Sequence, residues 1–188
     1  DSISPESASM LTLVLAVAMV DAINEEVQDA KCYVKWPNDI VLNNRKISGT
    51  LTEMSAEMDS IHYVVIGIGI NVNTTDFDES IKDMATSIYL GTGKKVKRSN
   101  IIAAFSHSFK KYYEAFLKTQ DLTYIVDRYN ELLINNGRTV KAIYANKELV
   151  GEALGINKDG ELIIKTEDGC ETAIRAGEVS VRGLYGYV

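Results

Sequence analysis

The chain of 188 residues has only two prolines, two cysteines and one tryptophan. Cys32 and Cys170 lie far apart and fit no zinc-ligand spacing, so we expect reduced thiols rather than a disulfide framework. The formal net charge of −6 leaves no basic footprint for nucleic-acid binding by this chain. No internal repeat or low-complexity stretch is visible. These absences predict an ordinary globular protein of the cytoplasm.

No apolar run is predicted to cross a membrane. Glu6 and Asp21 enclose fourteen uncharged residues, whereas a membrane-spanning helix needs about 18 or more. The flank before this run is acidic, which argues against a signal peptide. Ser4 as an N-cap and Pro5 at the first helical position instead predict one buried helix that runs to about Val27.

Most of the information lies in residues 35–73, where polar clusters follow apolar, strand-like runs. The clusters read Lys-Trp-Pro-Asn-Asp at residues 35–39, Lys-Ile-Ser-Gly at 46–49 and Gly-Ile-Gly-Ile-Asn-Val-Asn at 67–73. Lysine, carboxylate and amide side chains next to glycines, which permit close approach, suit a phosphate-containing ligand. The sequence therefore predicts a phosphate-binding site in this stretch.

The first two clusters are joined by a predicted β-hairpin. Pro37 ends the first strand because it has no N–H for a ladder, and Asn43-Asn44 tolerates the positive φ angles of a tight turn. The hairpin is expected to bring four residues together: Asn38, Asp39, Lys46 and Gly49.

The third cluster ends a long apolar strand. Residues 63–70 are nearly all apolar, which predicts a central strand buried on both faces. Asn71 and Asn73 share a face of an extended segment, so we expect both amides at the site. Gly67 and Gly69 do not form a dinucleotide-binding motif, because Val72 replaces the third glycine and no helix follows directly. Either a ligand approaches the strand at these glycines, or a helix packs over them.

The rest of the chain predicts two helices and a small β domain. Aromatic residues at helical spacing indicate a helix over residues 100–118, and a second helix is expected over 121–133. Short strands separated by glycine-bearing turns follow residue 137, which is typical of a small barrel. The predicted class is α+β, with a mixed or antiparallel sheet packed on helices in residues 1–136 and a barrel in 137–188.

In this order, the three clusters closely resemble those of bacterial biotin–protein ligases. Two further segments agree with the family: Asp-Met-Ala-Thr-Ser at residues 83–87 and Gly-Glu-Val-Ser-Val-Arg-Gly at 177–183. The resemblance spans nearly the whole chain. It implies a catalytic domain like that of class II aminoacyl-tRNA synthetases, followed by an SH3-like barrel.

The resemblance also implies a two-step reaction. The carboxylate of biotin attacks the α-phosphate of ATP, with Mg²⁺ present, and pyrophosphate leaves biotinyl-5′-AMP. A lysine of a biotin carrier protein of the acetyl-CoA carboxylase type then displaces AMP. Neither step needs a covalent enzyme intermediate, so the enzyme acts by positioning and by stabilising charge.

Site residues follow from the matching motifs. Lys46 matches the family lysine that contacts the biotin carboxylate and the α-phosphate, although a solvated hairpin lysine is the alternative. Asn38 and Asp39 match positions near the ATP phosphates and metal, although both residues also suit a simple turn. The other expected substrate- or ATP-binding residues are Lys35, Gly49, Gly69, Asn71, Ala85 and Thr86, with the last two on the adenine side.

Two other functions stay open. The first is a dimeric, biotin-responsive repressor, in which DNA would be bound only by an upstream domain. The second is a lipoate–protein ligase. The family's Gly-Arg-Gly-Arg type biotin-holding loop normally precedes the region where this chain begins. The resemblance therefore implies the C-terminal portion of a longer ligase, and the isolated chain is expected to be inactive. A homodimer is an expectation from the resemblance alone.

Overall fold

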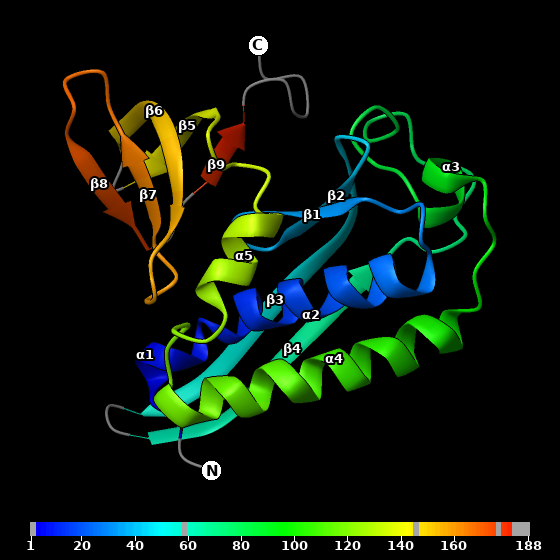
Figure 1. Cartoon of the computed structure of the whole chain (residues 1–188), viewed down its shortest axis with the longest axis horizontal. Helices are drawn as coiled ribbons and strands as arrows, with labels where there is room; N and C mark the ends of the chain where they lie inside the picture. Colours follow the sequence, from blue (N-terminus) through cyan, green and yellow to red (C-terminus); the bar gives the residue numbers. More distant parts are fainter. Residues whose placement is uncertain (1–2, 58–59, 145–146, 176–177, 182–188) are drawn as a thin grey trace.

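The computed structural model describes residues 3–57, 60–144, 147–175 and 178–181, which form two antiparallel sheets and five helices (Figure 1). The first sheet has the order β1-β2-β3-β4. Its strands are β1 (Cys32–Lys35), β2 (Asp39–Leu42), β3 (Arg45–Glu57) and β4 (Ser60–Ile70). The helices are α1 (Pro5–Ala8), α2 (Leu11–Glu26), α3 (Ile88–Thr92), α4 (Arg98–Thr119) and α5 (Val126–Leu132). Long helices α2 and α4 lie across one face of this sheet.

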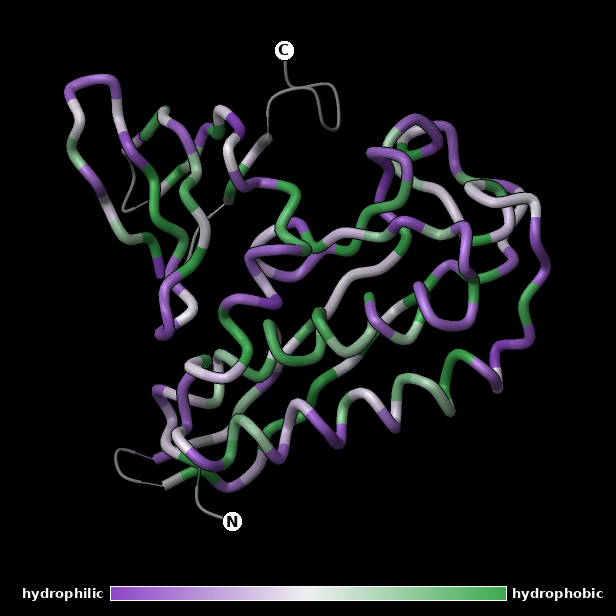
Figure 2. Tube along the Cα trace, in the orientation of Figure 1, coloured by the Kyte–Doolittle hydropathy of each residue, from purple (hydrophilic) through white to green (hydrophobic). Residues whose placement is uncertain are grey.

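Helix α2 is the centre of the hydrophobic core. It is apolar on every side because it packs between the sheet, α4 and α5, as its green colour in Figure 2 shows. By length and composition, residues 5–26 could cross a membrane. In the fold, however, 78% of the apolar stretch is buried, which is what a core helix requires.

The prediction of one helix from Ser4 to Val27 is wrong, because the helix is interrupted at Ser9 and Met10. Ser4 does cap α1, and its hydroxyl accepts a hydrogen bond from the Ser7 N–H. At the interruption the Met10 N–H donates to the Ser7 carbonyl, three residues back, and the Ser9 hydroxyl donates to the Glu6 carbonyl. These two hydrogen bonds, one from a backbone N–H and one from a side-chain hydroxyl, each span three residues. They replace the α-helical bonds, which span four residues, for one turn.

The hairpin between β2 and β3 is confirmed. Asn43 and Asn44 have φ angles of 52° and 60°, the left-handed conformation that a tight hairpin turn needs. Strand β4 differs from the prediction, because it lies at the edge of the sheet and only one of its faces is covered. Tyr63 and Val65 on the other face are 59% and 53% exposed. An apolar run by itself does not distinguish one buried face from two.

The second sheet has the order β8-β7-β6-β5-β9 and is attached through α5 (Figure 1). Its strands are β5 (Thr139–Tyr144), β6 (Lys147–Ile156), β7 (Leu162–Lys165), β8 (Glu171–Ile174) and β9 (Glu178–Val181). The α+β class is thus confirmed. Outer strands β8 and β9 are not paired with each other in the described part of the chain, so a closed SH3-like barrel stays a prediction. The family segment at residues 177–183 lies partly outside the described residues.

Candidate functional site

Four predicted site residues form one row across the first sheet. Lys35 on β1 pairs with Asp39 on β2, Asp39 pairs with Gly49 on β3, and Gly49 pairs with Gly69 on β4. Residues paired directly across antiparallel strands project to the same face of a sheet. The row therefore places an ammonium group, a carboxylate and two glycines side by side, on the face that α2 and α4 leave open.

Lys46 reaches back over this row from the start of β3. Its Nζ lies 2.5 Å from Oδ1 of Asp39, whose side chain is 12% exposed. A Cβ at Gly49 would lie 3.2 Å from Lys46 Cε and 3.3 Å from Nζ. A larger residue at position 49 would therefore shift the end of the lysine side chain by a few tenths of an ångström.

A cavity of about 610 Å³ opens over the row. Its lining includes seven of the predicted site residues: Lys35, Asp39, Lys46, Gly49, Gly69, Asn71 and Ala85. No heavy atom of the described residues lies within 4 Å of the position that a Cβ would take at Gly67 or Gly69. This geometry favours approach of a ligand over packing of a helix at these two glycines.

The segment after the long loop holds Lys46 through its backbone. The Lys46 N–H donates to the Met84 carbonyl, and the Thr86 N–H donates to the Lys46 carbonyl, both at 2.8 Å. Lys46 and Ala85 thus form a parallel β-bridge. Ala85 lines the cavity, whereas Thr86 is buried and contributes its backbone. The loop therefore fixes the start of β3 as well as one wall of the cavity.

The two amides after β4 have different roles. Asn71 lines the cavity, and its N–H donates to the Ile47 carbonyl. The Asn73 side chain instead donates to the Val96 carbonyl at 2.8 Å and accepts from the Val96 N–H at 3.1 Å. The expected delivery of both amides to the site is therefore wrong for Asn73, because the strand ends at Ile70 and the backbone bends.

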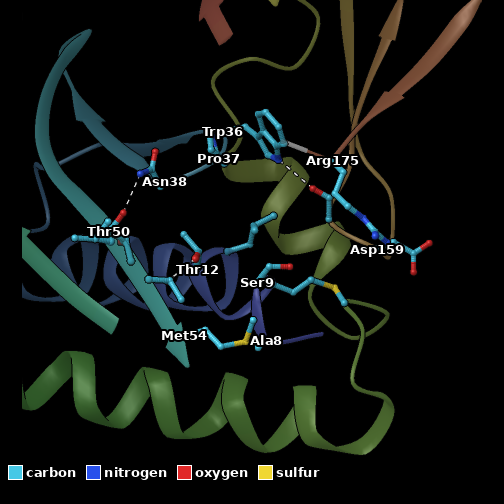
Figure 3. A pocket seen from close by; sticks show the side chains of 15 residues that line it. Ala8, Ser9, Thr12, Trp36, Pro37, Asn38, Thr50, Met54, Asp159 and Arg175 are labelled. Atoms are coloured by element: carbon cyan, nitrogen blue, oxygen red, sulfur yellow. Dashed lines mark hydrogen bonds between the residues drawn. The ribbon is translucent and has the colours of Figure 1, made fainter. Parts of the chain in front are cut away.

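Asn38 does not line the Lys46 cavity. Its Nδ2 donates to the Thr50 carbonyl at 2.8 Å, and its own carbonyl accepts from the Thr50 N–H at 3.0 Å (Figure 3). It caps the edge of β3 where the pairing with β2 ends. Its side chain faces a second cavity of about 380 Å³, between β3, the start of α2 and the turn after β6.

The structure adds four lining residues that were not predicted as site residues: Ile47, Ser48, Ile81 and Met84. Ile81 and Met84 form an apolar wall, and both are about 40% exposed. The sequence could have indicated both residues, because they are apolar side chains in the otherwise polar loop before Ala85. Ser48 also lines the cavity and carries a buried hydroxyl with no hydrogen-bond partner among the described residues. Its place in the Lys-Ile-Ser-Gly cluster at residues 46–49 was the available signal.

Comparisons with known proteins agree on one family. A model described as the biotin/lipoate A/B protein ligase family matches residues 1–71, and one described as the biotin protein ligase C terminal domain matches residues 137–182. The bifunctional ligase/repressor BirA of Bacillus subtilis is 39% identical over 166 residues, which is 87% of this chain and 50% of that protein. The biotin–[acetyl-CoA-carboxylase] ligase of Paracoccus denitrificans is 28% identical over 181 residues, covering 94% of this chain and 75% of that protein.

A solved structure shows the same relationship. The biotin protein ligase of Aquifex aeolicus, in complex with biotin and ATP, has a TM-score of 0.79 and 30% identity to this chain. The similarity covers 93% of this chain and 71% of the Aquifex chain. The chain therefore belongs to the biotin protein ligase family. It spans about half the length of the Bacillus relative.

Proposed function

We propose that the protein is an ATP-dependent biotin–protein ligase. It would activate biotin as biotinyl-5′-AMP and transfer the biotinyl group to a lysine of a carrier protein. The observation that carries this proposal is the row of Lys35, Asp39, Gly49 and Gly69 beneath a cavity, with the Lys46 ammonium held over it. A cation above a flat glycine floor suits the biotin carboxylate and the α-phosphate of ATP, both of which carry negative charge before they react.

In the first step a carboxylate oxygen of biotin attacks the α-phosphorus of ATP, and the bond to pyrophosphate breaks. In the second step the neutral lysine amine of the carrier attacks the acyl carbon and AMP leaves, with the amine proton passing to solvent. Lys46 stabilises the negative charge that develops on the α-phosphate oxygens in both steps. The enzyme supplies no nucleophile, so its contribution is orientation and charge.

The strand register suggests how the substrates lie. Leu51 pairs with Gly67 in the next outward-facing row of β3 and β4, and Leu51 is 65% exposed. With its carboxylate near Lys46, biotin would rest its apolar ring system over Gly67 and against Leu51. The adenine side would then face Ala85 and the apolar wall of Ile81 and Met84.

Mg²⁺ would be held mainly by the phosphates of ATP. Asp39 is the one carboxylate in the lining of the Lys46 cavity, and the described residues contain no group of three or more His, Cys, Asp or Glu suited to a metal. Magnesium commonly keeps its waters and relies on substrate phosphates with one or two carboxylates, so Asp39 fits this role.

The partner and setting are proposed by family resemblance. The name of the Paracoccus relative supports acetyl-CoA carboxylase, through its carrier domain, as the acceptor, and the reaction would take place in the cytoplasm. The name of the Bacillus relative supports a second role as a repressor. We propose that this repressor would respond to biotin as a dimer, with DNA bound outside this acidic chain. We place the domain boundary between residues 136 and 137, supported by Gly137 at a φ of +68° just before β5.

Thermal unfolding of the full-length protein tests the proposal. Biotin with ATP and Mg²⁺ should raise the melting temperature far more than either ligand alone, because the tightly bound adenylate forms only from both. Lipoate in place of biotin should give no such shift. A larger shift with lipoate would identify the protein as a lipoate–protein ligase instead.

A further inference from the structure

Trp36 connects the candidate site to the second sheet. It is the only tryptophan of the chain, is 1% exposed, and directly precedes the turn that carries Asn38 and Asp39. Its backbone N–H donates to Oδ1 of Asn135 at 3.0 Å. Its indole Nε1 donates to the carbonyl of Gly160, also at 3.0 Å (Figure 3). Both bonds are buried, so their loss would leave polar groups without water to replace the partner.

The Gly160 end of this connection is rigid. Gly160 lies in the turn between β6 and β7, where the Asn157 side chain accepts hydrogen bonds from the N–H groups of Asp159 and Glu161. The Leu122 N–H donates to the Lys158 carbonyl at 2.7 Å, which ties the turn to the segment before α5. The turn is thus a fixed support for the indole.

The other end of the connection leads into the Lys46 cavity. Two residues beyond Trp36, Asn38 makes two hydrogen bonds to Thr50 on β3. The next residue, Asp39, holds the ammonium of Lys46. The position of the indole therefore determines where the Asn38–Asp39 turn meets β3, and Asp39 at the end of this turn lines the cavity beside Lys46. The glycine floor at Gly67 and Gly69 is set by the pairing of β3 with β4 and does not depend on Trp36.

We propose that Trp36 is a positioning residue for ATP: the turn between β6 and β7 sets the Asn38–Asp39 turn through the indole N–H. This inference rests on the proposed function for its choice of ligand. Disturbing the connection should weaken ATP binding while leaving biotin binding nearly unchanged, because only the phosphate end of the cavity would move.

Two variants of the full-length protein disturb the connection from opposite ends. Trp36→Phe removes the indole donor and keeps most of the ring. Gly160→Ala acts from the second sheet, because Gly160 has a φ of +78° and an added Cβ would lie 3.3 Å from Leu13 Cδ2. Gly169→Ala is the matched control: its φ of +84° imposes the same backbone penalty in the turn between β7 and β8, where a Cβ meets no described atom within 4 Å.

ATP and biotin affinities are measured by calorimetry, and both KM values are measured in adenylate formation. We expect Trp36→Phe and Gly160→Ala each to weaken ATP binding roughly tenfold, because a displaced Asp39 would no longer hold the phosphate end in position, with biotin affinity changed by less than about twofold. Gly169→Ala should match the wild type for both ligands.

Three results would overturn the inference: unchanged ATP affinity in both variants, equal losses for ATP and biotin, or an equal ATP loss in Gly169→Ala. The last two would indicate general loosening of the fold. If the wild type binds ATP but does not activate biotin, the proposed function is refuted. The inference about Trp36 is still tested in that case, because the ATP affinities of the variants can be compared with that of the wild type. A wild type that binds no ATP would refute both.

Discussion

The two faces of strands β3 and β4 differ in a way that separates stability from chemistry. On one face Val64, Ile66, Ile68 and Ile70 pack against the helical layer. On the other face the same strands present Gly49 and Gly69 in the cavity with the Lys46–Asp39 pair, and Gly67 in the next row. Alternation of side chains along a strand lets one segment serve both purposes. Substitutions on the covered side should therefore change the free energy of unfolding, and substitutions on the open side should change activity.

Phe116→Ala should have the largest effect on the covered side. Phe116 on α4 is fully buried in the core, so its truncation should lower the free energy of unfolding by about 3–5 kcal/mol. Urea unfolding measures this loss, while the activity of the folded fraction should not change. Ile102→Ala on the same helix is the control, since Ile102 is 64% exposed and should cost less than about 0.5 kcal/mol. Equal costs for both would contradict the described packing.

Lys46→Gln should have the largest effect on the open side. Removing the ammonium should reduce transition-state stabilisation by about 2.7–4 kcal/mol, seen as a loss of biotin-dependent pyrophosphate release. The melting temperature should hardly change, because the Lys46 side chain is 45% exposed and such pairs contribute little to stability. Lys94→Gln breaks an exposed pair with Asp29, outside the cavity, and should behave as wild type. Near-normal pyrophosphate release from Lys46→Gln would remove Lys46 from the proposed role.

Gly49→Ala should have a smaller effect than Lys46→Gln. Compared with Gly67→Ala, it distinguishes the Lys46 end of the open face from the end proposed to hold the biotin rings. The new Cβ would press on the Lys46 side chain and move its ammonium, so kcat for adenylate formation should fall roughly tenfold. Gly67→Ala should instead raise the KM for biotin, because Gly67 lies beneath the proposed ring position and not beneath Lys46. If both variants changed the same parameter, the assignment of the two ends would be wrong.

Asp121→Asn should have the smallest effect, and this effect is on the free energy of unfolding and not on activity. Partial burial raises its pKa, but hydrogen bonds from Thr119 and Thr123 and the nearby Lys158 charge outweigh this and lower the pKa to about 2. Because the folded pKa lies below the unfolded value near 3.8, the stabilisation is present above about pH 4 and is lost as the pH falls toward 2. Asp121→Asn should therefore be less stable by about 1 kcal/mol at pH 7. Thermal melts should show this difference in stability narrowing from about pH 4 toward pH 2, and a pH-independent difference would contradict the assignment.

Local sequence predicted the hairpin and its consequences well. The Asn43-Asn44 turn sets the pairing of Val41 with Lys46, so the approach of the two strands followed from short-range chemistry. The sequence did not indicate the β-bulge next to Val41, which shifts the register by one residue and brings Gly49 opposite Asp39. The α+β class and the second, strand-rich part of the chain followed from periodicity and from the glycine-bearing turns.

Long-range packing accounts for what could not be predicted. Whether an apolar strand such as β4 is covered on one face or two depends on the other elements of the fold, not on its own residues. Asn71 and Asn73 look alike in sequence, and only the bend after Ile70 and the distant Val96 backbone assign Asn73 to structure. The partner of the Trp36 indole lies 124 residues away, beyond any local signal.

A crystal structure of the full-length protein with a non-hydrolysable biotinyl-adenylate analogue tests the central claim most directly. Lys46 Nζ should lie about 3 Å from an oxygen of the phosphate-equivalent group, with the biotin rings over Gly67. The claim is contradicted if the analogue occupies the second cavity beside Asn38 and Trp36 while Lys46 contacts only Asp39.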